Sequence, residues 1–229
     1  MDSIVAFADI LGTTERVNRG VFDDIESLDF ANPVGIVARY NEFMRFAVFS
    51  DSVFVSAPVG RLHEFASVMS FLYSQWFSDA ILVRGGISVG EINWVDDSNT
   101  DGLFGRLKNL SYARVYGKAL VAAHAVEQRS GPGGICFLDE PAAETLAQAS
   151  DQYVLKGGTD SLIWADTRGI DYWFDVLSLR LSREEAGTEA RRHLRATVDY
   201  FFRLKASGQC LPDDFLYSTM GGISYASTR

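Results

Sequence analysis

The chain has 229 residues, 47% of them hydrophobic and 13% aromatic, which is enough apolar material for one good core. Its 30 acidic and 21 basic residues give a formal net charge of -9, so its overall field opposes binding to nucleic-acid backbones and anionic membranes. No apolar run approaches the roughly 18 residues of a membrane span, and no basic segment precedes the first apolar run as in a signal peptide. We therefore expect a cytoplasmic protein that binds neither nucleic acid nor membrane.

Cysteine and histidine are too sparse to indicate a disulfide framework or a zinc site. The two cysteines, Cys136 and Cys210, are expected to be ordinary thiols. The three histidines, His63, His124 and His193, lie far apart and show no spacing typical of metal ligands.

Strand-like and helical patterns alternate along the chain, with a hairpin in its first half. Runs of β-branched and aromatic residues indicate strands, and apolar residues three or four positions apart indicate helices. In chain order the patterns predict a strand at 3–10, a helix at 33–44, a hairpin of 45–50 and 52–57, a helix at 61–77, a strand at 80–95, a surface loop at 96–113, a helix around 117–130, a strand at 135–139 and a short helix begun by Pro141. The remaining patterns predict strands at 152–157, 161–166 and 171–177, and a closing helix at 182–206 begun by Ser182.

This order of elements is typical of an α+β protein with a ferredoxin-like antiparallel sheet and helices on one face. We predict a single domain at 1–229, with a core at 3–140, C-terminal strands and a helix at 150–207, and a tail at 208–229. In such a sheet the first strand and the central hairpin are neighbours, so residues at their ends lie close together.

Two aspartates are expected to converge at that place. Asp9 ends the first strand and Asp51 lies at the tip of the hairpin. Oxygen ligands are preferred by magnesium and manganese, and one or two carboxylates with substrate phosphates commonly hold magnesium. The alternative is that Asp51 hydrogen-bonds its own backbone as a turn residue and that Asp9 merely ends a strand.

A glycine-threonine turn follows the first strand. Gly12, Thr13 and Thr14 could present backbone N–H groups to a phosphate, or cap a following helix. A second pattern, Gly-x-Ser-x-Gly at 86–90, matches the nucleophile turn of hydrolases around Ser88. That turn requires a helix directly after the serine, whereas strand-like residues follow here, so we disfavour a hydrolase.

Four segments together resemble the class III nucleotidyl cyclase catalytic domain. They are "FADILGTT", "FSDSVFVS", "VRGGISVGE" and "VYGKALVAAHAVEQRS", which occur in family order between residues 4 and 130. The resemblance implies that Asp9, Asp51 and the Ile10 carbonyl bind two divalent ions, Mn²⁺ or Mg²⁺, and that residues 12–14 hold a triphosphate. It also implies a homodimer with its sites at the interface, and attack of the ribose 3′-oxygen on the α-phosphorus with release of pyrophosphate.

The chain departs from the purine cyclases of that family where they read the base. Their lysine and aspartate correspond to Ala47 and Arg114, so the pair that recognises a purine is missing. With Arg114, a bulkier strand residue such as Arg45 or Phe46 would suit a smaller base. The chain looks most like the bacterial pyrimidine cyclases of antiphage signalling, which implies UTP as substrate, cyclic UMP as second messenger and a separate effector that responds to it. An arginine favours uracil over cytosine because both uracil carbonyls accept hydrogen bonds; CTP remains the alternative.

A second departure concerns the helix that faces the partner subunit in this family. The family's transition-state asparagine and arginine correspond to Val121 and Ala125, and loss of one such donor typically costs about 10²–10³ in rate. Lys118 and Arg129 lie near the same helix face and are candidate catalytic replacements. The alternatives are that both are solvated charges, and that the chain is a silent nucleotide-binding homodimer. We expect His124 to be a packing or surface residue.

Overall fold

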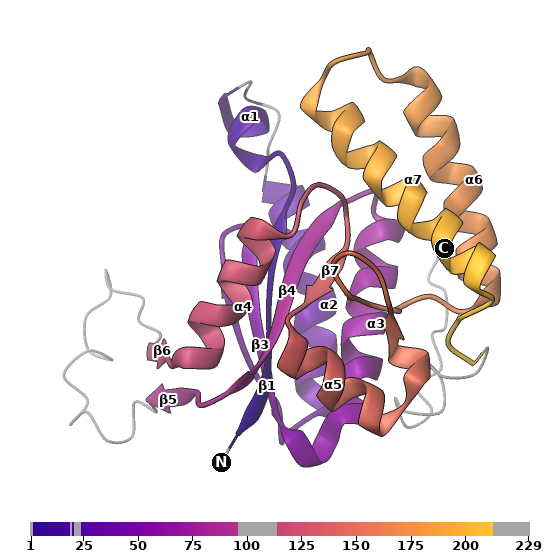
Figure 1. The fold of residues 1–229 in the computed structure, drawn as a ribbon. Coiled ribbons are helices and arrows are strands. Elements are labelled where there is room, and N and C mark those ends of the chain that lie inside the picture. The colour runs from indigo at the N-terminus through magenta and orange to yellow at the C-terminus, as the bar shows by residue number, and fades with distance from the viewer. Residues whose placement is uncertain (1, 19, 21–23, 96–113, 213–229) are drawn as a thin grey trace.

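The computed structural model describes the chain except at residues 1, 19, 21–23, 96–113 and 213–229 (Figure 1). The predicted loop at 96–113 and most of the predicted tail thus lie outside the described residues. The strands of the main sheet are β1 (Ser3–Ile10), β2 (Arg45–Phe49), β3 (Ser52–Pro58), β4 (Val83–Gly90), β7 (Cys136–Leu138), β8 (Val154–Leu155) and β9 (Ser161–Leu162), and β5 (Asn93–Val95) pairs with β6 (Arg114–Tyr116) in a separate ribbon. The helices are α1 (Thr13–Asn18), α2 (Asp24–Tyr40), α3 (Leu62–Ser78), α4 (Lys118–Arg129), α5 (Glu140–Ala149), α6 (Thr167–Arg183) and α7 (Glu189–Ser207).

The centre of the main sheet has the predicted ferredoxin-like arrangement. Within the described residues the strand order is β2-β3-β1-β4-β7-β9-β8, with β1 antiparallel to both β3 and β4. The bounds of β1 are the predicted ones, and the hairpin lies where the Ser-Asp-Ser turn predicted it. The sheet is therefore mixed only beyond β4, which pairs with β7 in parallel. The α+β prediction is confirmed.

Helices cover both faces of the sheet, not one face as predicted. The neighbouring glycines of β4 show this, because successive strand residues point to opposite faces. A Cβ atom on Gly85 would meet the Tyr73 hydroxyl of α3, whereas one on Gly86 would overlap the Ala123 carbonyl oxygen of α4. Each helix thus packs directly on strand backbone, and α4 occupies the face opposite α3 (Figure 1).

The main hydrophobic core lies on the α3 side. From β1 it takes Ile4, Ala6, Ala8 and Ile10, all of them buried, together with the buried face of α3. The α4 side holds a smaller apolar cluster made by Val5, Phe7, Ala119 and Ala123. Alternation along β1 therefore places Asp9 on the α4 side, next to the small cluster.

The predicted strand at 171–177 is wrong, because this segment lies inside α6. Its aromatic residues favoured a strand, but Ile170, Trp173 and Leu177 are buried at helical spacing. The Asp166 carboxylate begins the helix by accepting a hydrogen bond from a backbone N–H of the first turn.

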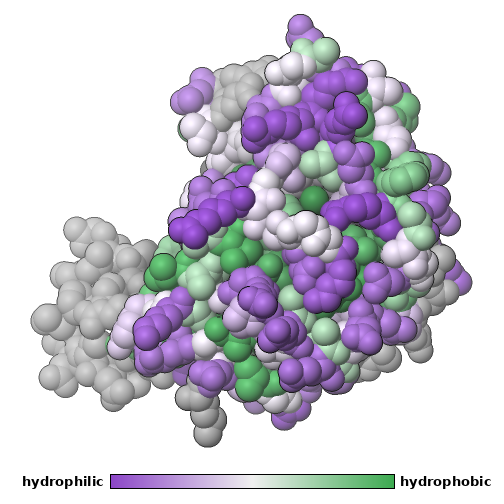
Figure 2. All heavy atoms as spheres, viewed as in Figure 1, coloured by the Kyte–Doolittle hydropathy of each residue, from purple (hydrophilic) through white to green (hydrophobic). Residues whose placement is uncertain are grey.

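The closing helix begins later than predicted. Thr188, not Ser182, caps α7 by accepting a hydrogen bond from the Arg191 N–H at 3.1 Å. The helix ends at Gly208, whose φ of 67° is left-handed and favours glycine. α6 and α7 pack side by side as a helical hairpin at one end of the molecule (Figure 1). Hydrophilic residues predominate over this end in Figure 2, and hydrophobic ones gather nearer α4.

Candidate functional site

The tip of the β2–β3 hairpin is fastened to the end of β1. Asp9 lies opposite Ser52 in the strand register, and the Ser52 hydroxyl donates a hydrogen bond to the Asp9 carboxylate at 2.7 Å. On the other side of the same junction, the Ile10 N–H donates to the Asp51 carbonyl at 2.9 Å. The structure thus brings Asp9, Ile10 and Asp51 together.

The surroundings of Asp9 disfavour the ionised form of its carboxylate. The pKa of Asp9 is raised from its ordinary 3.8 to about 6, with burial as the main cause and the nearby charges of Asp51 and Glu127 acting in the same direction, whereas the hydrogen bond from Ser52 acts to lower it. Arg84 acts to lower it. A half-buried carboxylate with two carboxylate neighbours is an arrangement that a bound cation stabilises.

The donor set fits a hard divalent ion. Asp9 and Asp51 offer carboxylate oxygens, and the Ile10 carbonyl accepts a hydrogen bond from the Thr13 hydroxyl at 3.1 Å. Among the described residues no group of three or more His, Cys, Asp or Glu could hold a metal ion. Two carboxylates and a carbonyl leave coordination positions for water and phosphate, which is the environment that Mg²⁺ and Mn²⁺ prefer.

The turn after β1 is short and tightly shaped. Gly12 has a φ of 81°, a left-handed conformation that favours glycine. Thr13 begins α1, which has only six residues. Gly12 and Thr14 are exposed, while the Thr13 hydroxyl is occupied by the Ile10 carbonyl. The residues predicted to hold a triphosphate therefore lie directly beside the carboxylate pair.

Sequence reasoning missed two charged residues of this site. Arg84 lies opposite Asp9 in the strand register, and its guanidinium forms an ion pair with Glu127 of α4. Glu127 is fully buried, and Arg84 also donates to the Gly131 carbonyl at 3.4 Å. The available signal was a single arginine beside two glycines in a strand, but its partner depends on a register and a helix position that the sequence pattern does not give.

The residues predicted to read the base divide between the two faces of the sheet. Ala47 lies opposite Phe54, whose ring packs on Phe7 at 4.9 Å between centroids, so Ala47 is on the same side as Asp9. Arg45 shares that side because strand residues two apart do. Phe46 faces the other way and packs against the main core, so it does not join them. Arg114 begins β6, but its side chain lies outside the described residues.

The predicted replacements on α4 lie at its two ends. Lys118 begins the helix and Arg129 ends it, which separates them by about 16 Å along the axis. Their backbone positions therefore lie at opposite ends of the helix. Val121 between them is 70% exposed.

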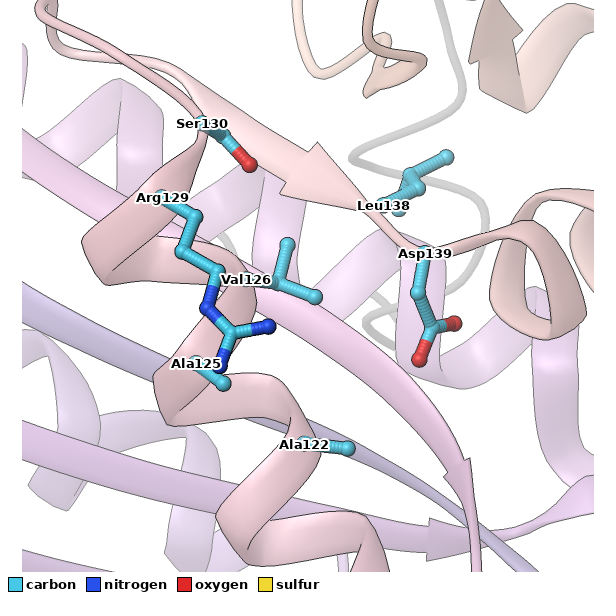
Figure 3. Close-up of a pocket in the computed structure, with 7 residues that line it drawn as sticks. All are labelled: Ala122, Ala125, Val126, Arg129, Ser130, Leu138 and Asp139. Atoms are coloured by element: carbon cyan, nitrogen blue, oxygen red, sulfur yellow. The ribbon is translucent and has the colours of Figure 1, made fainter.

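Arg129 borders a cavity of about 330 Å³ between α4 and the junction of β7 with α5. In Figure 3 its side chain runs back along the helix, so that the guanidinium lies beside Ala125. The Asp139 carboxylate lies across the same hollow, where it also caps α5 through the Ala142 N–H at 2.9 Å. His124 packs edge-on against Phe7 at 4.8 Å, as a packing residue would.

No family model matches the sequence, and no curated protein matches it. The fold, in contrast, is similar to solved structures. One is the crystal structure of the guanylyl cyclase Cya2, at 11% identity and a TM-score of 0.50, covering 71% of this chain and 90% of that one. Another is a monomeric double mutant of the guanylyl cyclase domain of the RhoGC fusion protein from the aquatic fungus Blastocladiella emersonii, at 12% identity and a TM-score of 0.50, covering 70% of this chain and 92% of that one.

Among the described residues, the structure contains no helix with both the length and the apolar character that a membrane span requires. Both structures match this chain over about nine tenths of their own length. The chain therefore shares the α+β fold of these guanylyl cyclase structures.

Proposed function

We propose that the chain is a nucleotidyl cyclase that converts UTP into 3′,5′-cyclic UMP and pyrophosphate. The observation that carries the proposal is the meeting of Asp9 and Asp51 at the end of β1, in a fold shared with guanylyl cyclases. Two carboxylates beside an exposed glycine-threonine turn are the parts that a metal-assisted reaction of a nucleoside triphosphate needs.

Each residue at this place has a defined task in the proposal. Asp9, Asp51 and the Ile10 carbonyl would hold two divalent ions, which lower the pKa of the ribose 3′-hydroxyl and neutralise the triphosphate when bound. Ser52 orients the Asp9 carboxylate through its 2.7 Å hydrogen bond. Arg84 places a positive charge opposite Asp9, on the side where the phosphates would lie.

The preference for uracil rests on the α4 side of β2. Ala47 offers no hydrogen bond, so it cannot read the edge of a purine, and Arg45 lies on the same side of the sheet. A guanidinium donates and does not accept, so it suits the two carbonyl oxygens of uracil better than the amino group of cytosine. The proposal gives Phe46 no part in this recognition, because it faces the other side of the sheet and packs against the main core.

The outer side of α4 would face an identical subunit. The Arg129 guanidinium lies beside Ala125, the position that corresponds to the family's transition-state arginine, so we favour Arg129 over Lys118 (Figure 3). In a homodimer each Arg129 would approach the carboxylate pair of its partner and stabilise charge on the transferred phosphorus. Cyclic UMP would then act as a second messenger on a separate effector in antiphage defence, as the resemblance implies.

The second candidate function is a catalytically silent nucleotide-binding homodimer. Val121 and Ala125 favour it, because neither carries a donor that could stabilise the transition state. The exposure of Val121 fits a packing contact as well as it fits a catalytic face.

The test is to incubate the protein with all four ribonucleoside triphosphates and Mn²⁺, and to identify products by mass spectrometry with pyrophosphate release in parallel. We expect cyclic UMP, its loss in Asp51→Asn, and its retention in Asp175→Asn, an exposed aspartate on α6. Cyclic CMP would revise the base assignment. Nucleotide binding without pyrophosphate release would instead establish the silent homodimer.

A further inference from the structure

A second cavity, of about 320 Å³, lies between the α6–α7 hairpin and the end of the sheet that carries the carboxylate pair. Leu11 and Gly12 from the turn after β1 line it, as do Ala80 and Leu82 from the segment between α3 and β4. These two segments are joined by a hydrogen bond from the Leu11 N–H to the Leu82 carbonyl at 2.9 Å. The cavity thus begins at the turn beside Asp9 and extends under the C-terminal helices.

Arg180 of α6 lines this cavity with a weakly bound guanidinium. Its guanidinium is half-buried, yet within the part of the chain that the structure describes it forms no ion pair. The hydrogen bond found for it there is a long one to the Ala80 carbonyl, at 3.5 Å. That contact places the guanidinium on the wall shared with the turn after β1. A half-buried cation without a paired anion is costly unless a ligand supplies one.

The charges around the cavity are arranged unevenly. Arg16 of α1 lies close enough to Arg180 to reinforce the lowering of its pKa by burial, which Glu184 opposes. On the α7 wall, the Glu189 carboxylate already binds Arg192 at 2.8 Å and His193 at 3.0 Å. The cations Arg16 and Arg180 therefore lie towards Gly12. Of the two carboxylates that line the cavity, that of Glu189 is already bound by residues of its own helix, α7.

We propose that this cavity receives the terminal phosphates of the nucleoside triphosphate, and that Arg180 binds them. The inference rests on the proposed function, because it places the α-phosphorus at the carboxylate pair and lets the phosphate chain continue past Gly12 under α6. A guanidinium suits this task, since its planar fork donates two parallel hydrogen bonds to phosphate oxygens. The α6–α7 hairpin then contributes directly to substrate binding.

The test measures binding to the full chain by calorimetry with three probes in the presence of Mn²⁺. They are 3′-deoxy-UTP, which lacks the attacking hydroxyl, UMP, which lacks the terminal phosphates, and inorganic tripolyphosphate, which lacks base and ribose. The variant is Arg180→Ala, and the matched control is Arg183→Ala, which removes an exposed charge from the same helix. We expect Arg180→Ala to weaken binding of 3′-deoxy-UTP and tripolyphosphate about 10- to 100-fold and to leave UMP within about twofold. Arg183→Ala should leave all three within about twofold.

Several results would overturn the proposal: unchanged affinity in Arg180→Ala, equal losses in both variants, an equal loss for UMP, or no binding of tripolyphosphate to the parent. A fourth probe, free pyrophosphate, distinguishes a site for the substrate's phosphates from a site for a free anion. If Arg180 were needed to bind pyrophosphate but not to bind 3′-deoxy-UTP or tripolyphosphate, the cavity would be a separate anion site and the substrate assignment would be refuted. If Arg180→Ala unfolds, Arg180→Lys keeps the charge without the fork and should weaken both triphosphate probes several-fold, with an unchanged melting temperature. Failure of the proposed cyclase activity is distinct, because it appears as absence of cyclic product in the parent.

Discussion

The two faces of β1 and β4 differ in kind although the same strands make both. Towards α3, β1 presents Ile4, Ala6, Ala8 and Ile10, an apolar row inside the main core. Towards α4, the row that contains Val5 and Phe7 ends in Asp9. Period-2 alternation lets one strand anchor the fold on one side and present charge on the other, so stability and chemistry are built by alternate residues.

The charged face should be most sensitive at its buried ion pair. Glu127→Gln leaves the Arg84 guanidinium without its anion, and breaking a buried pair typically costs about 3–5 kcal/mol. The control, Glu64→Gln, breaks the exposed pair with Arg61 at 2.8 Å and should cost less than about 1 kcal/mol. Urea unfolding of both variants measures the difference in the free energy of unfolding. Equal losses would mean that the buried Arg84–Glu127 pair on the α4 face contributes no more to stability than an exposed pair.

The second-largest effect concerns the close approach of α4 to the sheet. Gly86→Ala places a Cβ atom against the backbone of α4 at Ala123 and Glu127, and we expect a loss of about 1–3 kcal/mol. Gly35→Ala in α2 meets nothing within 4 Å and should stabilise the protein by up to about 1 kcal/mol, because alanine favours the helix. Thermal melting of the two variants should show a lowered melting temperature for Gly86→Ala and a raised one for Gly35→Ala. Shifts of the same sign would argue against direct packing of α4 on β4.

The smallest expected effect is a gain in stability on replacing Asp9. Because the pKa of Asp9 is raised to about 6 in the folded protein from its ordinary 3.8, the free energy of unfolding falls as the pH rises between these values and stays lower above them. Asp9→Asn removes this cost, so it should stabilise the metal-free protein by about 1–2 kcal/mol at pH 8, after discounting for solvent screening, and leave it unchanged below about pH 4. Asp175→Asn serves as control across the same pH series. A destabilised Asp9→Asn at pH 8 would contradict the charged-face account.

Local patterns predicted most of the first half of the fold. The continuous apolar run of β1 and the Ser-Asp-Ser turn predicted that strand and hairpin well, because residue composition and turn chemistry are local signals. The pairing of Arg84 with Glu127 could not be predicted, since it depends on α4 crossing β4 at Gly86. In α6 the aromatic residues favoured a strand, and helical burial of Trp173 and Leu177 against the rest of the fold prevailed.

The candidate site was predicted unevenly for the same reason. Asp9 and Asp51 were placed together by a strand order that the chain pattern indicated. The base-reading segment was resolved less well, because a pattern names residues 45–47 without saying which of them face the α4 side. Arg180 carried no signal at all, since the helix that presents it was partly assigned as a strand.

The most direct test of the account locates the metal ion. Fe²⁺ can replace Mn²⁺ at an oxygen-rich site, and with ascorbate it cleaves the backbone nearest to the ion. We predict cleavage of the native protein near residues 9–12 and 50–52, with both sets of fragments lost in Asp51→Asn and retained in Asp175→Asn. Cleavage elsewhere in the chain, or an unchanged pattern in Asp51→Asn, would show that Asp9 and Asp51 do not form a metal clamp.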